Sequence, residues 1–345
     1  MKKLFYIGSI NFGILLAILL LMEIASRVLL PRGDIQTIFN DEKLRTRGRS
    51  FVESDTTRGF ALKPGYSDGL YNINSKGFRG KEFNDLSNKR VILALGESTT
   101  FGWGVKDDQT YPFLLGQLIG ERGGIQVVNG GIPSYTSSQT LAYLRKILAE
   151  NDLKPSMVLV NILWNDIWYS TISNWYPDIL IYQKPPQWIT FLTSHSRFVN
   201  GLIMGFSKND HLIDVFNEAA LVQYGKNIEA MILSCREKGV DLVFVEPPFD
   251  GDHMPEKGLN EFHVRYSKAF FIKTSQTYLG KLHSIAAKFG VPVVSHRLDM
   301  GNLHQEPLFM DTLHPTAEGN GMMAYDIYEK IIPLLGLEPA NTVVQ

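Results

Sequence analysis

The chain has 345 residues, of which 44% are hydrophobic, and its 34 Lys and Arg residues nearly balance its 35 Asp and Glu residues. This length and composition allow one substantial hydrophobic core. The balanced charge excludes a strong field for nucleic acid or an anionic membrane surface, so we expect a neutral partner. Cys235 is the only cysteine, which excludes an internal disulfide and a cysteine-rich metal site but fits either a reducing or an oxidising compartment.

The first thirty residues contain a long apolar run. Lys2 and Lys3 precede residues 4–22, which are interrupted only by small or weakly polar side chains. The run is long enough to span a bilayer, so we predict that residues 1–30 form an uncleaved membrane anchor. Because positive residues stay on the cytoplasmic side, the bulk of the chain is expected to be extracytoplasmic, either periplasmic or at the cell surface.

Two other interpretations of the apolar run stay open. A cleaved signal peptide shows the same order of charged and apolar residues, but residues 23–30 offer no convincing small-x-small cleavage site. A buried helix of a soluble core is less favoured, because no regular polar face appears between Phe12 and Met22.

The remainder of the chain divides into a connector and an α/β domain. Residues 31–89 contain prolines and several glycines with little periodicity, which predicts a connector that wraps the domain before its first strand. From Arg90 onward, short apolar runs alternate with helical patterns, which predicts a domain over residues 90–336 with a mostly parallel five-stranded sheet. An insertion is expected at 167–214 and a short tail at 337–345. The apolar runs are 91–95, 126–129, 157–163, 241–246 and 292–295, and the helical patterns are near 110–122, 138–152, 215–239, 265–290 and 317–335.

The first apolar run ends in a turn that carries a serine. Ser98 follows Gly96 and Glu97, just beyond a strand that is expected to be buried. Active groups gather at the carboxyl ends of the strands in a parallel α/β sheet, and a nucleophile is exposed there. A serine in such a turn more often satisfies local backbone groups, so Ser98 alone does not establish catalysis.

An aspartate and a histidine near the end of the chain change this estimate. Asp311 and His314 are three residues apart, just before a helical pattern. On one turn, this spacing lets the carboxylate reach the imidazole. A serine hydroxyl needs a base that takes its proton and a third group that orients the base. His314 and Asp311 are therefore the predicted base and orienting group for Ser98.

An acyl-transfer enzyme also needs hydrogen-bond donors for the oxygen that becomes negative in the transition state. The side-chain amide of Asn165 lies in the loop after the third apolar run. The loop at residues 129–134 follows the second run and is rich in exposed backbone N–H groups. The sequence therefore places possible oxyanion donors at two further strand ends.

These motifs together resemble the SGNH (GDSL-type) hydrolase family over residues 88–335. The family's Gly-Asp-Ser motif appears as Gly96-Glu97-Ser98, and residues 101–105 resemble its extracytoplasmic bacterial members. The resemblance implies a flavodoxin-like three-layer sandwich, a serine esterase activity and no cofactor. It also implies that Ser98 is the nucleophile, with Asp311 and His314 completing the triad.

The same resemblance implies an oxyanion hole formed by the backbone N–H groups of Ser98 and Ser134 and by the amide of Asn165. The chain departs from the family pattern at two glycines, which are replaced by Ser134 and Leu163. Ser134 keeps its backbone N–H, but this position demands a conformation that glycine adopts more readily. Gly131 is the alternative donor.

Other polar residues are expected to be structural. Asp166 follows Asn165, and a strand-end aspartate more often holds a loop by hydrogen bonds than acts in catalysis. No pair of histidines with a third ligand shows the spacing of a metal site, so we expect no metal. The histidines taken as surface or core residues are His195, His211, His253, His263, His283, His296 and His304.

Aromatic residues are dense between Trp164 and Phe206. They include Trp164, Trp168, Tyr169, Trp175, Tyr176, Trp188 and Phe191. A satellite core is the commonest outcome for such a segment, but a surface that stacks on sugar rings, a lid over an acyl chain and a face packed against the membrane stay open.

We therefore expect an anchored serine esterase that hydrolyses O-acyl esters, with acetyl esters of a cell-surface or exported polysaccharide as the substrate suggested by analogy. An O-acetyltransferase with the same triad is a second hypothesis, because only water exclusion separates the two reactions. A non-catalytic carbohydrate-binding envelope protein and a lipid esterase are two more. The expected partners are an acylated carbohydrate or another small ester and, through residues 1–30, the membrane.

Overall fold

A computed structural model describes residues 2–29, 51–83, 86–120, 122–150, 152–170, 187–206, 214–251, 254, 266–296 and 307–338. The chain forms two compact units. Three helices, α1, α7 and α8, belong to the first unit, and all strands and the other described helices belong to the second. Each unit is described by itself below.

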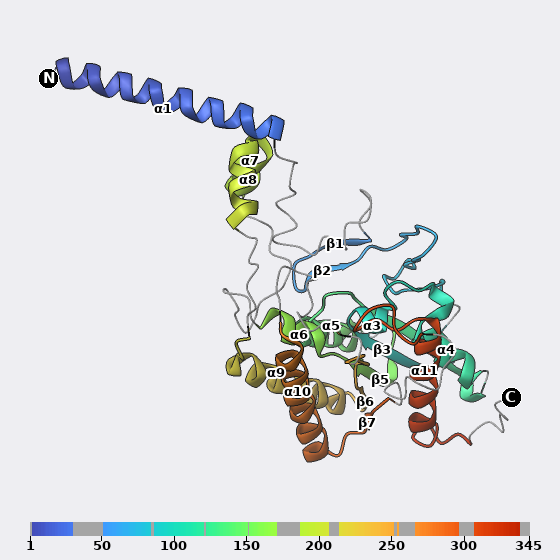
Figure 1. Cartoon of the computed structure of the whole chain (residues 1–345). Coiled ribbons are helices and arrows are strands. Elements are labelled where there is room, and N and C mark those ends of the chain that lie inside the picture. The colour runs from blue at the N-terminus through green and yellow to red at the C-terminus, as the bar shows by residue number, and fades with distance from the viewer. Residues whose placement is uncertain are drawn as a thin grey trace. The chain divides into compact units, whose positions relative to one another are not determined.

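The second unit is built on a five-stranded sheet in which all neighbouring strands are parallel (Figure 1). Its strand order is β4-β3-β5-β6-β7, which is the flavodoxin-like order 2-1-3-4-5. The strands are β3 (Arg90–Gly96), β4 (Ile125–Gly131), β5 (Pro155–Asn161), β6 (Asp241–Val245) and β7 (Val293–Val294). Each of the five apolar runs forms a strand, so the predicted α/β fold is confirmed.

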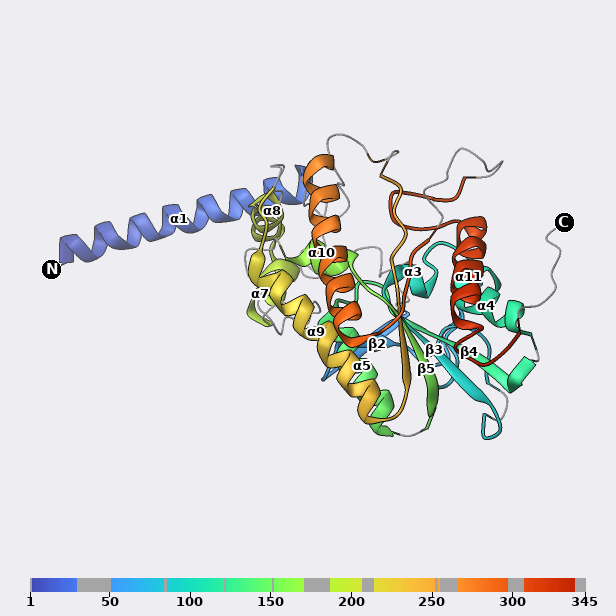
Figure 2. The ribbon, with the colours of Figure 1, turned by 90° about the horizontal axis from the view of Figure 1, so that it is seen from below.

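Helices cover both faces of the sheet and complete three layers (Figure 2). One face is covered by α4 (Tyr111–Ile119) and α11 (Ala317–Ile331), which contact each other and the sheet. The other face is covered by α5 (Ser137–Glu150) and α9 (Glu218–Glu237), with α10 (Lys268–Phe289) packed on α9. The predicted helical patterns therefore correspond to five observed helices.

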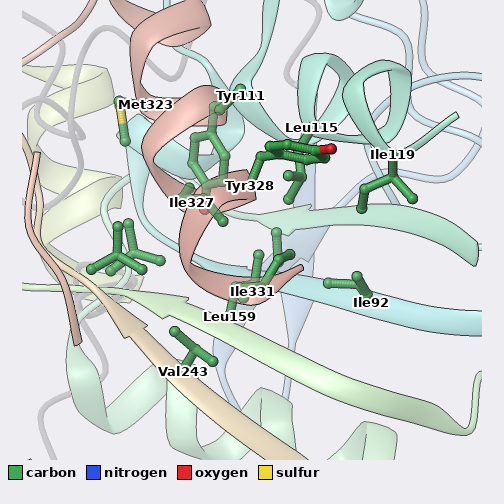
Figure 3. Close-up of a cluster of buried hydrophobic side chains, with 14 of the residues drawn as sticks. Ile92, Tyr111, Leu115, Ile119, Leu159, Val243, Met323, Ile327, Tyr328 and Ile331 are labelled. Carbon is green, nitrogen blue, oxygen red and sulfur yellow. The ribbon is translucent and has the colours of Figure 1, made fainter. Parts of the chain in front are cut away.

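The core between the sheet and the α4–α11 layer explains why the strands read as continuous apolar runs. Ile92, Leu159 and Val243 from neighbouring strands meet Tyr111 of α4 and Ile327 of α11 (Figure 3). All of these side chains are at most 1% exposed. Because each strand is buried on both faces, the alternation typical of half-exposed strands is lost.

The second unit also contains a short hairpin that the sequence analysis missed. β1 (Val52–Asp55) and β2 (Gly59–Leu62) pair antiparallel within the segment predicted as a connector. The Asp55 side chain closes their turn by accepting hydrogen bonds from the backbone N–H groups of Thr57 and Arg58, both at 2.9 Å. Residues 31–50 of the predicted connector and 339–345 of the predicted tail lie outside the described residues.

The first unit consists of α1 (Lys2–Leu29), α7 (Gln187–His195) and α8 (Arg197–Phe206). The stretch Ile10–Leu29 of α1 is long and apolar enough to cross a membrane. Anchors and signal sequences near an N-terminus share this property. The other two helices lie in the predicted aromatic insertion, of which Trp175 and Tyr176 fall outside the described residues.

Candidate active site

Ser98 follows the carboxyl end of the internal strand β3, where it begins the short helix α3 (Ser98–Phe101). The side chain is partly exposed, whereas Thr99, Thr100 and Phe101 are buried. Gly96 permits the turn, because a Cβ at this position would lie 2.2 Å from the carbonyl oxygen of Asn161. The tight turn therefore presents the serine hydroxyl at the edge of the sheet.

Asp311 and His314 reach Ser98 from the segment that precedes α11. The Nε2 atom of His314 lies 2.9 Å from Ser98 Oγ, and its Nδ1 atom lies 2.7 Å from Asp311 Oδ2. Thr316 then caps α11 by accepting a hydrogen bond from the Gly319 N–H. The structure thus brings the three predicted triad residues together in one chain of hydrogen bonds.

The carboxylate of Asp311 is held in its ionised form. Partial burial opposes ionisation, but the hydrogen bond and charge of His314 and the backbone N–H groups of Leu313 and His314 outweigh it, and the pKa of Asp311 falls to about 2. These two N–H groups donate to Asp311 Oδ1 at 2.9 and 2.8 Å. A negative Asp311 therefore fixes the imidazole so that Nε2 faces the serine.

Glu97 links the Ser98 turn to the strand end that carries Asn165. Its carboxylate is fully buried and accepts hydrogen bonds from the backbone N–H groups of Leu163, Trp164 and Asn165 at 3.2, 2.9 and 3.0 Å. It also accepts a hydrogen bond from the Asn165 side-chain amide. Helix α6 (Trp164–Tyr169) has no side-chain cap of its own, so Glu97 supplies acceptors for its first N–H groups.

Two carboxyl groups beside the site, fully buried Glu97 and partly buried Asp166, have raised pKa values. Burial raises the pKa of Glu97 to about 8, although the backbone donors of Trp164 and Asn165 favour the charged form. Burial also raises the pKa of Asp166 to about 7, against hydrogen bonds from Ser137. Asp166 accepts from the Ser137 N–H at 2.7 Å and from its hydroxyl at 2.5 Å, so Asp166 ties α6 to the start of α5.

The amide of Asn165 is fully engaged in this structure. Its Nδ2 atom donates to Glu97 and, at 3.1 Å, to the carbonyl oxygen of Tyr135. A primary amide has two protons, so a third acceptor requires that one of these two hydrogen bonds be exchanged. The sequence predicted Asn165 as a donor but did not indicate these competing acceptors.

The loop after β4 has the backbone conformation expected at Ser134. This residue is buried and has φ of +66°, in the left-handed region that glycine adopts more readily. The alternative donor, Gly131, gives its N–H to the Asn129 side chain at 3.0 Å. By contrast, the φ of Leu163 is −170°, outside the positive range that favours glycine.

An aromatic side chain lies beside the histidine, and the sequence analysis did not assign it a role. The ring of Trp103 is 6.4 Å from the ring of His314 and is partly exposed. It also contacts the rings of Phe51 and Tyr71. Trp103 follows α3 directly, and its proximity to His314 was not visible because the two residues are far apart in the sequence.

Two other histidines of the sheet domain lie beside acidic side chains other than Asp311. His283 contacts Glu246, and His296 is buried 3.4 Å from Asp326. His211, His253, His263 and His304 lie outside the described residues. Within the ranges that the structure describes, no three His, Cys, Asp or Glu side chains gather in a possible metal site.

Comparison with known proteins identifies the family of this chain. A sequence model of the GDSL-like Lipase/Acylhydrolase family matches residues 94–322. No curated protein matches the chain.

Several solved structures are similar at low sequence identity. The esterase EstA from Pseudoalteromonas sp. is 14% identical, with a TM-score of 0.44, and the match covers 72% of this chain and 99% of EstA. A mutant of Axe2, an acetylxylan esterase from Geobacillus stearothermophilus, is 16% identical, with a TM-score of 0.43 and coverage of 73% and 97%. A lipase/acylhydrolase from Enterococcus faecalis is 17% identical, with a TM-score of 0.41 and coverage of 73% and 100%.

The family match spans most of the chain, from the end of β3 to the middle of α11, and includes Ser98, Asn165, Asp311 and His314. The chain belongs to the GDSL-like Lipase/Acylhydrolase (SGNH) family and is a serine hydrolase that acts on esters.

Proposed function

We propose that Ser98 is the nucleophile, His314 the general base and Asp311 the group that orients His314. The observation that carries this assignment is the pair of hydrogen bonds of 2.9 and 2.7 Å that His314 makes with Ser98 and Asp311. Both distances are within the range required for proton transfer and for orientation of the base.

The reaction follows from this geometry. Ser98 Oγ attacks the carbonyl carbon of the ester while its proton passes to His314 Nε2. When the tetrahedral intermediate collapses, the bond to the alcohol breaks and the alcohol oxygen takes that proton. A water molecule then attacks the acyl-enzyme with help from His314, which releases the acid and restores the Ser98 hydroxyl.

We assign the oxyanion to three donors: the backbone N–H groups of Ser98 and Ser134 and the amide of Asn165. Asn165 can turn one proton toward the oxyanion by giving up its 3.1 Å hydrogen bond to the neutral carbonyl of Tyr135. A negatively charged oxygen is the stronger acceptor, so the exchange favours the transition state over the free enzyme.

The proposed substrates are O-acetyl esters of a cell-surface or exported polysaccharide. The leaving alcohol must lie beside His314, since it takes its proton from Nε2. Trp103 is the partly exposed aromatic side chain next to that ring. An indole offers a flat apolar surface with a polar edge, which suits a sugar ring as the leaving group.

We also propose that α1 is retained as a membrane anchor. Glu23 of α1 accepts hydrogen bonds from the Ser196 hydroxyl at 2.7 Å and from the N–H groups of Arg197 and Phe198 at 3.0 Å. Removal of α1 as a signal peptide would leave the N-terminus of α8 without this acceptor. Lys2 and Lys3 at the other end of α1 favour an extracytoplasmic catalytic domain.

The first experiment is hydrolysis of p-nitrophenyl acetate by the full-length protein in detergent, compared with Ser98→Ala. We expect Ser98→Ala to lose about 10⁶-fold in turnover, since no other group replaces the nucleophile. Ser54→Ala, which changes an exposed serine of β1, is the matched control and should keep full activity.

Substrate class is tested with the same proteins. We expect wild-type protein to release acetate from acetylated xylan faster than fatty acid from p-nitrophenyl palmitate. The opposite order would favour a lipid esterase, and acetyl release that appears only with an added sugar acceptor would favour a transferase. Equal activity of wild type and Ser98→Ala in every assay would contradict the assignment of the nucleophile.

A further inference from the structure

The three helices of the first unit have polar side chains on the inside. Among their described side chains, the buried ones are Ser26 on α1, Thr193 on α7 and Asn200 on α8, at 7%, 3% and 3% exposure. Glu23 of α1 accepts hydrogen bonds from the backbone N–H groups of Arg197 and Phe198 at the start of α8. Small and polar side chains therefore mediate the contacts among these helices.

The outer faces of the same helices carry large apolar side chains. On α7, Trp188, Phe191 and Leu192 are 64%, 61% and 40% exposed. The i, i+3, i+4 spacing places them on one face of the helix. Leu202 on α8 is 42% exposed, and α1 exposes apolar residues along most of the stretch Ile10–Leu29.

This distribution is the inverse of the one in the sheet domain, where Ile92, Leu159 and Val243 are buried. A unit surrounded by water gains stability by burying such side chains, and exposure of this many of them is unfavourable. In lipid, the outer apolar surface carries no such cost, and small or polar residues are the usual contacts between helices. The inversion is therefore the pattern expected for a unit surrounded by lipid.

The hydrogen bonds place α7 and α8 at one end of the candidate membrane span. Glu23 and Arg27 lie in the last two turns of α1, and Arg27 donates to the carbonyl oxygen of His195 at 3.3 Å. Helices α7 and α8 have 9 and 10 residues. At about 1.5 Å per residue they are roughly 15 Å long, too short to cross the ~30 Å hydrocarbon core.

We propose that α7 and α8 form a hairpin that lies in the membrane–water interface, on the extracytoplasmic side of the membrane that α1 crosses. Lipid then covers the face that carries Trp188, Phe191 and Leu192. This inference rests on the proposal that α1 stays in the membrane as an anchor. Tryptophan prefers the headgroup level, and short helices with one apolar face bind in the plane of the interface. The hairpin and the end of α1 then form one membrane-embedded unit that holds the chain at two points.

The chain is well suited to a test with single labels. Cys235 is fully buried, and burial raises the pKa of its thiol to about 12, so it does not react with a thiol-directed dye in the folded protein. Full-length Phe191→Cys is labelled with the environment-sensitive dye NBD and reconstituted into phosphatidylcholine–phosphatidylglycerol vesicles. Ile18→Cys marks the middle of α1, and Leu334→Cys, at an exposed position of the sheet domain, is the matched control.

We expect the label at 191 to show blue-shifted emission, strong quenching by nitroxides near the lipid headgroups and several-fold weaker quenching by iodide than the label at 334. Ile18→Cys should be quenched best by nitroxides deep in the acyl chains. Esterase activity of each labelled protein reports that the sheet domain is folded, independently of the membrane result.

Three outcomes would overturn the proposal. If the label at 191 behaves like the label at 334 while the label at 18 is quenched by lipid nitroxides, the anchor exists but the hairpin lies in water. If position 191 is shielded from both iodide and lipid nitroxides, a protein surface covers the face instead. If positions 18 and 191 both report water, the anchor proposal fails together with the hairpin, whereas the assignment of Ser98 is judged separately by activity.

Discussion

Two acidic side chains lie near Ser98, and their surroundings shift their pKa values in opposite directions. Asp311 is 33% exposed in its side chain and lies against His314, and its pKa falls to about 2. Glu97 is fully buried among backbone and amide donors, and its pKa rises to about 8. Both accept backbone N–H groups, so the difference comes from burial and from the histidine that only Asp311 faces.

The comparison separates two requirements of one reaction. In the proposed reaction, His314 gains a positive charge when it takes the serine proton, so a permanently negative partner is needed on the Asp311 side. On the Glu97 side, the donors must keep a fixed direction before charge develops on the substrate. A buried carboxyl group with four hydrogen bonds meets the second requirement through geometry.

The largest effect is expected on the Asp311 side. Asp311→Asn keeps the shape of the side chain but offers a neutral amide to His314, which favours the wrong tautomer, so turnover should fall by about 10⁴. Asp55→Asn is the matched control, because Asp55 also has a pKa of about 2. Partial burial raises this pKa, but the ion pair with Arg58 outweighs burial and lowers it. The control should lose stability while keeping its turnover. A loss of less than tenfold in Asp311→Asn would remove Asp311 from the triad.

The second-largest effect is expected on the Glu97 side, when the side-chain amide of Asn165 is removed. Asn165→Ala should lower turnover by about 10²- to 10³-fold with little change in KM, since the interaction is made mainly in the transition state. Asn227→Ala removes another buried amide, which donates to Ser137 and Ser138, and it should change stability without this loss of turnover. A change confined to KM would show that Asn165 binds substrate and does not hold the oxyanion.

A smaller effect is expected when the Asn165 amide stays but its hydrogen-bond partner Glu97 is changed. Glu97→Gln replaces one of two acceptor oxygens with an NH₂ group, which must then face N–H groups of Leu163 and Trp164 or those of Asn165. We expect kcat to fall roughly tenfold to a hundredfold with KM unchanged.

Glu97→Asp tests the same contact in a second way. It restores the family's Gly-Asp-Ser motif but shortens the side chain by one methylene, so we expect it too to lower kcat. Glu53→Gln, at an exposed glutamate of β1, is the control and should keep full activity. If Glu97→Asp equals or exceeds wild type, the reach of the glutamate is not what positions Asn165.

The sequence predicted the sheet well, because a strand that is buried on both faces leaves a local pattern. Residues 91–95 form nearly all of β3 (Arg90–Gly96), since a strand buried on both faces is apolar throughout. Asp311 and His314 are three residues apart, so their contact is visible in the sequence.

Long-range contacts were not predictable in the same way. The backbone donors that Glu97 accepts lie 66, 67 and 68 residues further along the chain, and no spacing rule connects them. The β1–β2 hairpin was also missed, because strands of four residues leave too short a pattern. The polar interior of the first unit depends on which faces of α1, α7 and α8 meet, which single-helix patterns do not reveal.

The pH dependence of stability distinguishes the Glu97 side from the Asp311 side. Burial raises the pKa of Glu97 to about 8 and the pKa of Asp166 to about 7, whereas the usual values are 4.5 and 3.8. Between these limits the folded state binds more protons than the unfolded state, so stability falls as pH rises from about 4.5 to 8. Glu97→Gln and Asp166→Asn should each flatten this slope in urea unfolding. If the slope is unchanged in both Glu97→Gln and Asp166→Asn, these carboxyl groups titrate normally, and Glu97, like Asp311, is charged in the free enzyme.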